Sequence, residues 1–339
     1  MTCGAFRDTE TMRGAPAGAL PCYPDAGPCR RTPPETPRVT LDIAAHLTRD
    51  ADRIAAALDD ALDAAPLDGE IARPDRLIAA MRHAGLGGGK RLRPVLLIAA
   101  ARLFGRDDAG VVTAGAALEC IHCYSLVHDD LPAMDDDDMR RGQPTVHKAY
   151  DEATAILAGD ALLTLAFDLI AAPAVHADAE IRLAASRELA RAAGLGGMAG
   201  GQMLDLASQH APRGETDIRE LQAMKTGALI RYAARTGARL AGAGPDDIDR
   251  LTRFGEIIGL AFQLADDLLD VEGDASALGK AAGKDAAAGK ATLVALKGAD
   301  WTRAELARLV EAATTELQPY GTQAEPLLAL ARFVAIRDR

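Results

Sequence analysis

Acidic residues are concentrated in two stretches of this sequence, HDDLPAMDDDDMRRGQPTVH at residues 128–147 and QLADDLLD at residues 263–270. The first contains a DDxxxxD pattern and the second a DDxxD pattern, formed by Asp129, Asp130, Asp135, Asp266, Asp267 and Asp270. Positions 266 and 270 are four residues apart, so a helix places both carboxylates on one face. Because apolar residues surround the second cluster, its charges are costly unless a cation neutralises them.

Magnesium is the ion that these side chains predict. Carboxylate oxygens are ligands that Mg²⁺ prefers, and Mg²⁺ commonly bridges protein carboxylates to the phosphates of a substrate. For residues 135–138 alone, a solvated acidic surface is an equally good interpretation. The presence of two separate clusters with apolar flanks favours the metal site.

Basic side chains that suit a phosphate lie in further segments, several of them rich in glycine. These segments supply Lys90, Arg91, Arg93, Arg140, Arg141, Lys225, Thr226, Lys280, Lys284 and Lys290. The chain has only seven lysines but 31 arginines, and most of the lysines lie in these segments. Lysine is a compact point charge that suits phosphate, and glycine lets backbone N–H groups approach a ligand. The GGGK sequence is not a P-loop, because the GxxxxGK[ST] pattern is not met.

The elements that would carry these residues are predicted to be helices. Helical periodicity of apolar residues is clearest at residues 41–62, 93–104, 111–130, 151–170, 180–194, 218–242 and 246–271. Gly and Pro mark the junctions, and neither an alternating strand pattern nor a long linker is found in this region. We therefore expect one all-α domain over residues 39–339. Residues 1–38 are rich in Pro and Gly, which predicts a disordered N-terminal extension.

Composition excludes several classes of protein. The net charge of −11 argues against nucleic-acid binding. No transmembrane helix is expected, because Asp160 and Asp168 interrupt the most apolar stretch, and the N-terminus lacks the apolar core of a secretory signal. Five cysteines are too few and too unevenly spaced for a disulfide framework in a chain of 339 residues, which favours a reducing cytoplasm.

Five motifs in order resemble those of the trans-polyprenyl diphosphate synthases, most closely the bacterial farnesyl diphosphate synthases. They are GGKRLRP, ECIHCYSLVHDDLPAMDDDDMRRGQPTVH, GGQMLDL, KTGALIR and FQLADDLLDVEGDASALGK. The resemblance implies an all-α isoprenoid synthase fold, with helices around a central cavity, in a homodimer. It also implies the head-to-tail condensation of isopentenyl diphosphate with dimethylallyl or geranyl diphosphate to give farnesyl diphosphate.

The resemblance assigns roles to individual residues. Both acidic clusters would hold Mg²⁺, about three ions in all, against the allylic diphosphate, where the metal stabilises the charge of the leaving group. The metal ligands would be Asp129, Asp130, Asp135, Asp266, Asp267 and Asp270, and the catalytic residues Asp129, Asp135, Asp266 and Lys225. The allylic diphosphate would contact Arg140, Lys225, Thr226, Gln263, Lys280 and Lys290. Isopentenyl diphosphate would contact Lys90, Arg93, His122 and Arg141.

Product length is expected to depend on Tyr124 and its small neighbour Ser125. In the family that the chain resembles, a bulky residue five positions before the first Asp blocks the hydrocarbon tunnel, and here that residue is Tyr124. A helical wheel does not place Tyr124 on the face of Asp129, so this assignment depends on the resemblance. In contrast, His122 precedes Asp129 by seven residues and lies on nearly the same helical face.

Two further motifs have simpler interpretations. Cys120 and Cys123 form a CxxC pattern, but no second Cys pair at finger-like spacing accompanies it, so we interpret them as two ordinary helical thiols. In GGQMLDL, the glycines suggest close helix packing, and Gln202 and Asp205 are expected to support the residues that contact substrate.

Three alternative functions remain open at this point. A geranylgeranyl diphosphate synthase has the same chemistry and a deeper tunnel. A class I terpene cyclase also ionises a diphosphate with Mg²⁺, but it has no use for GGKRLRP, His122 and a second DDxxD. A non-catalytic subunit of a heteromeric synthase would be expected to lose one Asp motif, and here both are intact.

Overall fold

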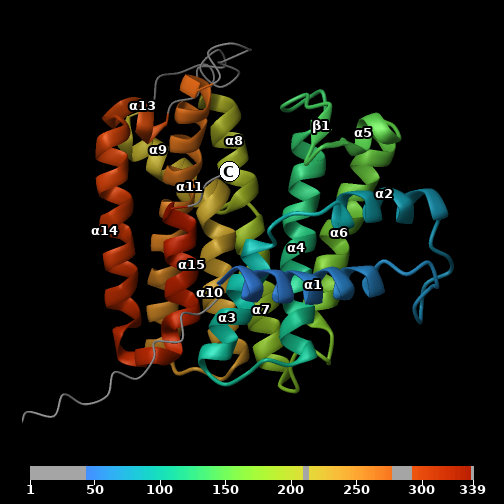
Figure 1. Ribbon diagram of the computed structural model, residues 1–339. Coiled ribbons are helices and arrows are strands. Elements are labelled where there is room, and N and C mark those ends of the chain that lie inside the picture. Colours follow the sequence, from blue (N-terminus) through green and yellow to red (C-terminus); the bar gives the residue numbers. More distant parts are fainter. Residues whose placement is uncertain (1–42, 209–213, 277–291, 337–339) are drawn as a thin grey trace, which may run out of the picture. The chain divides into compact units, whose positions relative to one another are not determined.

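The computed structural model describes residues 43–208, 214–276 and 292–336, which are mainly helical (Figure 1). The longer helices are α1 (Ile43–Ala61), α2 (Asp75–Leu86), α3 (Leu92–Leu103), α4 (Ala109–Asp129), α6 (Glu152–Ala171), α7 (Ala179–Ala193), α8 (Met198–Ser208), α10 (Ala228–Leu240), α11 (Pro245–Ser276), α14 (Ala299–Leu317) and α15 (Glu325–Ile336). The shorter elements are β1 (Met139–Arg140), β2 (Gln143–Pro144), α5 (Val146–Ala149), α9 (Glu215–Gln222), η1 (Ala223–Gly227), α13 (Leu293–Lys297) and η2 (Gln318–Ala324). The expected all-α fold is confirmed. The extension predicted at residues 1–38 lies outside the described residues.

Helix α4 is a core helix that packs against α1, α3 and α6. It begins at an N-cap, where the Asp108 carboxylate accepts a hydrogen bond from the Val111 backbone N–H at 3.1 Å. Gly115 permits a close approach of α1, because a Cβ at this position would lie 2.7 Å from Cδ1 of Ile54. This packing fixes the C-terminal end of α4, which carries the first acidic cluster.

Helices α4 and α6 are both long and apolar enough, by length and composition alone, to cross a membrane. Protein atoms bury 72% of the apolar window of α4, as expected for a core helix. In α6 only 33% of the window is buried, and Ile156 and Leu157 are 46% and 57% exposed. Asp160 and Asp168 are exposed on the same helix, and carboxylates suit a lipid environment poorly. The described residues therefore leave one partly apolar face of α6 uncovered.

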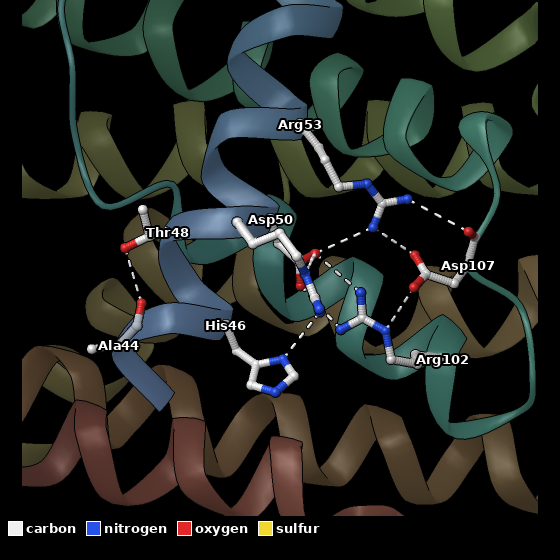
Figure 2. A network of polar contacts seen from close by, with 8 residues as sticks. Ala44, His46, Thr48, Asp50, Arg53, Arg102 and Asp107 are labelled. Atoms are coloured by element: carbon white, nitrogen blue, oxygen red, sulfur yellow. Dashed lines mark hydrogen bonds and ion pairs between the residues drawn. The ribbon is translucent and has the colours of Figure 1, made fainter. Parts of the chain in front are cut away.

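A network of ion pairs joins α1 to α3 and to the segment that follows α3 (Figure 2). Asp50 is only 1% exposed, and both of its carboxylate oxygens accept hydrogen bonds from Arg102 at 3.0 Å. Asp107 accepts from Arg53 at 2.6 Å and from Arg102 at 2.9 Å. Because the buried carboxylate is fully paired, the network holds α1 against α3 without an uncompensated charge.

The structure differs from the sequence-based expectation at two places. The helix predicted over residues 218–242 is interrupted, because α9 is followed by the π-helical turn η1 before α10 begins. A π-helical turn accommodates one additional residue, which apolar periodicity does not reveal. No strand was expected, yet β1 and β2 form an antiparallel hairpin in which Arg140 pairs with Gln143. Two residues per strand are too few to show an alternating pattern.

Candidate active site

A cavity of about 470 Å³ lies between α4, α8 and η1. Eight of the residues singled out in the sequence line it, namely Arg93, His122, Tyr124, Ser125, Asp129, Gln202, Lys225 and Thr226. The lining also contains the apolar side chains of Leu126, Met134, Met198, Met203 and Leu206. One cavity therefore combines charged groups with a surface suited to a hydrocarbon, as the resemblance to the family implies.

The second acidic cluster is connected to this cavity through one glutamine. The Thr226 hydroxyl donates to Gln263 Oε1 at 2.9 Å, and Gln263 Nε2 donates to the Asp267 carboxylate at 2.8 Å. The C-terminal ends of α4 and α11 also lie at the same end of the structure, at the top of Figure 1. The two acidic clusters therefore do not lie on opposite surfaces. Clusters on opposite surfaces could not both bind the same anion.

Two carboxylates at this end resist ionisation. Burial raises the pKa of Asp129 from 3.8 to about 6, although the nearby Lys225 charge lowers it. Burial likewise raises the pKa of Asp267 from 3.8 to about 6, against the hydrogen bond from Gln263. Such groups favour a bound cation, and because the donors are carboxylate oxygens, they fit a hard divalent ion.

Asp130 has a protein partner in this structure. Its carboxylate is 3% exposed and accepts two hydrogen bonds from Nε of Arg140, at 2.7 and 2.9 Å, while Nη2 of Arg140 lies 2.6 Å from the same group. Burial raises the pKa of Asp130 even though Arg140 opposes the shift. Arg140, predicted to bind the allylic diphosphate, is therefore already paired with Asp130, a predicted metal ligand. For both predicted roles to hold, Arg140 must either contact Asp130 and the diphosphate together or leave Asp130 when the diphosphate binds.

Lys225 is positioned by α8. Its ammonium group lies 2.6 Å from the Asp205 carboxylate, and a Cβ at Gly201 would lie 2.2 Å from the Lys225 backbone nitrogen. Gly201 and Asp205 are four residues apart, so one face of α8 provides both the close approach and the partner. The expected packing role of the glycines in GGQMLDL agrees with this geometry.

The residues predicted to bind isopentenyl diphosphate are only partly brought together. Arg93 and His122 line the main cavity, and Arg141 lines a small adjacent pocket with Arg140 and hydrogen-bonds to the Gly88 carbonyl. Burial, followed by the charges of Arg93 and Arg141, lowers the pKa of His122 well below 6.5, so its imidazole is neutral at pH 7. Lys90 is exposed and its ammonium lies 5.6 Å from the centre of the Phe333 ring in α15.

Tyr124 lines the same cavity as Asp129, although the helical wheel did not place them on one face. The cavity reaches around α4, since it also touches Ser125, Leu126 and His128. The Tyr124 ring packs edge-on against His128, with ring centres 5.8 Å apart. A cavity that wraps around a helix can contact side chains that a single helical face does not include.

Some predicted residues are peripheral or lie outside the described part of the chain. Asp135 and Asp270 are exposed, Asp266 is half-buried, and Lys280 and Lys290 fall outside the described residues.

One residue that the sequence analysis missed is Gln222, whose Nε2 donates to the Asp267 carboxylate at 2.9 Å. It precedes Thr226 by four residues, a spacing that could have drawn attention to it. Gln202 lines the cavity, and neither of its buried amide atoms has a hydrogen-bond partner among the described residues.

Cys120 and Cys123 are free and buried, in agreement with their interpretation as ordinary helical thiols. Burial raises the pKa of the Cys123 thiol to about 12. A thiol with so high a pKa is neither a good nucleophile nor a ready metal ligand.

Comparisons with known proteins agree with this geometry. A family model described as polyprenyl synthetase matches residues 74–320. The chain is 44% identical over 270 residues to farnesyl diphosphate synthase of Escherichia coli (strain K12), covering 78% of this chain and 90% of that protein. It is 41% identical over 304 residues to geranylgeranyl pyrophosphate synthase 9, chloroplastic, of Arabidopsis thaliana, covering 88% and 82% respectively. The apo structure of an FPP/GFPP synthase from Zymomonas mobilis matches with a TM-score of 0.77 at 40% identity, covering 87% of this chain and 99% of that chain.

Proposed function

This chain belongs to the polyprenyl synthetase family, and from that premise we propose that it condenses isopentenyl diphosphate head to tail with dimethylallyl and geranyl diphosphates. Farnesyl diphosphate is the proposed product. The observation that carries the proposal is the convergence of both acidic motifs on one site, where Asp129 and Lys225 line the cavity and Gln263 connects it to Asp267.

Magnesium is the proposed cofactor, and the residues fit it. Its ligands would be the carboxylates of both motifs, two of which have a pKa raised to about 6 by burial and are therefore stabilised by a cation. Bound Mg²⁺ would stabilise the negative charge that develops on the diphosphate as the allylic C–O bond breaks. The number of ions, about three by resemblance to the family, is part of the same proposal.

The side chains of the chain itself would bind and orient the substrates. Lys225, held by Asp205, would donate to the allylic diphosphate, while Arg93 and Arg141 would hold isopentenyl diphosphate. The neutral imidazole of His122 can donate a hydrogen bond without adding a charge beside the carbocation. Apolar residues such as Met198 and Leu206 would surround the hydrocarbon and exclude water that could capture the cation.

Geranylgeranyl diphosphate is the second candidate product. The similarity to the Arabidopsis thaliana enzyme extends over 88% of this chain, so comparison alone supports both products about equally. The structure favours the shorter one, because the half-buried Tyr124 ring lines the cavity and occupies space that a longer chain would need.

The activity is tested by incubating the full chain with Mg²⁺, isopentenyl diphosphate and dimethylallyl diphosphate, and by separating the products by chromatography. We expect farnesyl diphosphate, no product when a chelator replaces Mg²⁺, and recovery when Mg²⁺ is restored. Longer prenyl diphosphates would support the second candidate. If isopentenyl diphosphate remained unused while an allylic diphosphate was consumed, a terpene cyclase would be the correct function.

We further propose that the chain forms a homodimer in the cytoplasm. The uncovered apolar face of α6, with Ile156 and Leu157, suits a second copy of the chain, and the free thiols of Cys120 and Cys123 suit a reducing compartment. Sedimentation equilibrium of the wild type and of Leu157→Glu tests the dimer. A monomeric wild type, or a dimer unaffected by the new charge, would contradict this surface.

A further inference from the structure

A second group of metal-type ligands lies beside the β1–β2 hairpin, and none of its members lines the cavity described above. Asp136 and Asp138 precede β1, and His147 follows β2 in α5. One carboxylate oxygen of each aspartate and one ring nitrogen of His147 lie within 4.8 Å of one another. In the described part of the chain, no other three histidine, cysteine, aspartate or glutamate side chains come together in this way.

The hydrogen bonds of His147 determine which nitrogen is available. The Thr145 hydroxyl donates its single proton to the Asp137 carbonyl at 2.8 Å. His147 Nδ1, which lies 3.1 Å from the same hydroxyl oxygen, must therefore be the donor in that contact. The proton is thus on Nδ1, and Nε2 carries the lone pair.

His147 Nε2 has no hydrogen-bond partner among the described residues, although the side chain is only 7% exposed. Buried polar atoms nearly always have a partner, so an unpartnered ring nitrogen on a histidine that lies close to two carboxylates indicates a missing cation. The Nδ1–H to Thr145 contact strengthens this inference. In protein metal sites, a ligating histidine almost always donates its other ring N–H to a fixed acceptor.

The donor set indicates the class of ion. One imidazole nitrogen with two carboxylate oxygens suits Zn²⁺ or another divalent transition metal better than Mg²⁺, which prefers oxygen alone. Zinc bonds of about 2.0–2.2 Å place the ligand atoms of a tetrahedral site roughly 3.4 Å apart. Asp136 and Asp138 are exposed, so rotation of their side chains can bring the ligands together.

We propose that Asp136, Asp138 and His147 bind one Zn²⁺ ion at the base of the β1–β2 hairpin. The ion shares Asp138 with Lys148, whose ammonium lies 2.8 Å from that carboxylate, so binding competes with an existing ion pair. The site ties the two ends of the hairpin together, and the hairpin carries Arg140 and Arg141. Binding does not depend on the proposed activity, because none of the three ligands is among the six aspartates of the two Asp motifs, although Asp136 directly follows Asp135.

The test measures Zn²⁺ binding to the full, metal-stripped chain by calorimetry, without any diphosphate present. The wild type is compared with Asp136→Asn and Asp138→Asn, both at exposed positions where folding is little affected, and with the adjacent Asp137→Asn as the matched control. We expect one Zn²⁺ site that is at least about tenfold weaker in the first two variants and unchanged in the control.

A second measurement uses the unaltered protein. Long-range ¹H–¹⁵N spectra should show His147 protonated at Nδ1, with an Nε2 signal that shifts as Zn²⁺ is added. Zinc binding that is equal in wild type and Asp138→Asn would overturn the proposal, as would an Nε2 signal that does not move. Loss of the site in Asp129→Asn instead would assign the ion to the first acidic motif and also refute the proposal.

Discussion

The ammonium group of Lys225 lies 2.6 Å from the carboxylate of Asp205, which joins the π-helical turn η1 to helix α8. Both side chains are mostly buried, with 26% and 19% exposed. The contact directs a flexible side chain toward the cavity, where its charge also lowers the pKa of the buried Asp129. Without this partner, the lysine side chain would populate many more rotamers.

Replacing Asp205 by Asn should therefore lower kcat/KM for the allylic substrate by roughly tenfold to a hundredfold, because Lys225 is no longer held in place. Steady-state kinetics with geranyl diphosphate measure the effect. Asp52→Asn, an exposed carboxylate of α1, is the matched control and should retain wild-type kinetics. Unchanged kinetics in Asp205→Asn would show that the ion pair does not position Lys225.

Gly201→Ala should separate α8 from η1. The new Cβ would lie 2.2 Å from the Lys225 nitrogen and 2.6 Å from its Cα, so the backbone must move. We expect the free energy of unfolding to fall by about 1–3 kcal/mol, as for other overpacked sites. Urea unfolding measures this, and Gly196→Ala is the control because no atom lies within 4 Å of the added methyl group. Equal stabilities for the two variants would contradict the close approach.

Tyr124→Ala should lengthen the product from farnesyl toward geranylgeranyl diphosphate, because it removes a ring that lines the cavity. Chromatography of the products measures the chain length. Tyr124→Phe is the control, since it keeps the ring and removes only the hydroxyl, and it should give the wild-type product. If Tyr124→Ala still made only the wild-type product, this residue would not limit chain length.

Stability at acidic pH should depend on Asp107. Partial burial alone would raise its pKa, but hydrogen bonds from Arg102 and Arg53 outweigh this and lower the pKa below its usual 3.8 (Figure 2). The stabilisation is therefore complete above pH 3.8 and is lost as the pH falls through the lowered pKa of the folded state. In Asp107→Asn, the unfolding free energy measured by urea titration should depend less steeply on pH in this range. An identical slope in both proteins would exclude Asp107 as a contributor.

Features that repeat along the chain could be predicted from the sequence. Apolar periodicity located α4 and α11, because a buried helix must present apolar residues at each turn to its neighbours. The DDxxxxD and DDxxD patterns identified Asp129 and Asp267, since clustered carboxylates among apolar residues have few structural explanations. The seven-residue spacing also correctly related His122 to Asp129, which line one cavity.

Features that depend on how two elements meet could not be predicted. The pairing of Arg140 with Asp130 depends on a hairpin that folds back against the end of α4, and two-residue strands leave no pattern. The tautomer of His147, which leaves a lone pair on the unpartnered Nε2, depends on where the Thr145 hydroxyl points. The wheel of an isolated helix separated Tyr124 from Asp129, because it could not represent a cavity that extends around the helix.

The π-helical turn at Ala223–Gly227 sets the rotation of α9 about the helix axis relative to α10. Removing one residue from this turn would rotate α9, the helix that precedes it, by about 100° relative to α10. Since α10 is fixed by contacts such as Gly237 against the Leu97 carbonyl, it is α9 and the lysine that would turn away. Deletion of one residue here should therefore leave a folded protein in which Lys225 no longer points into the cavity.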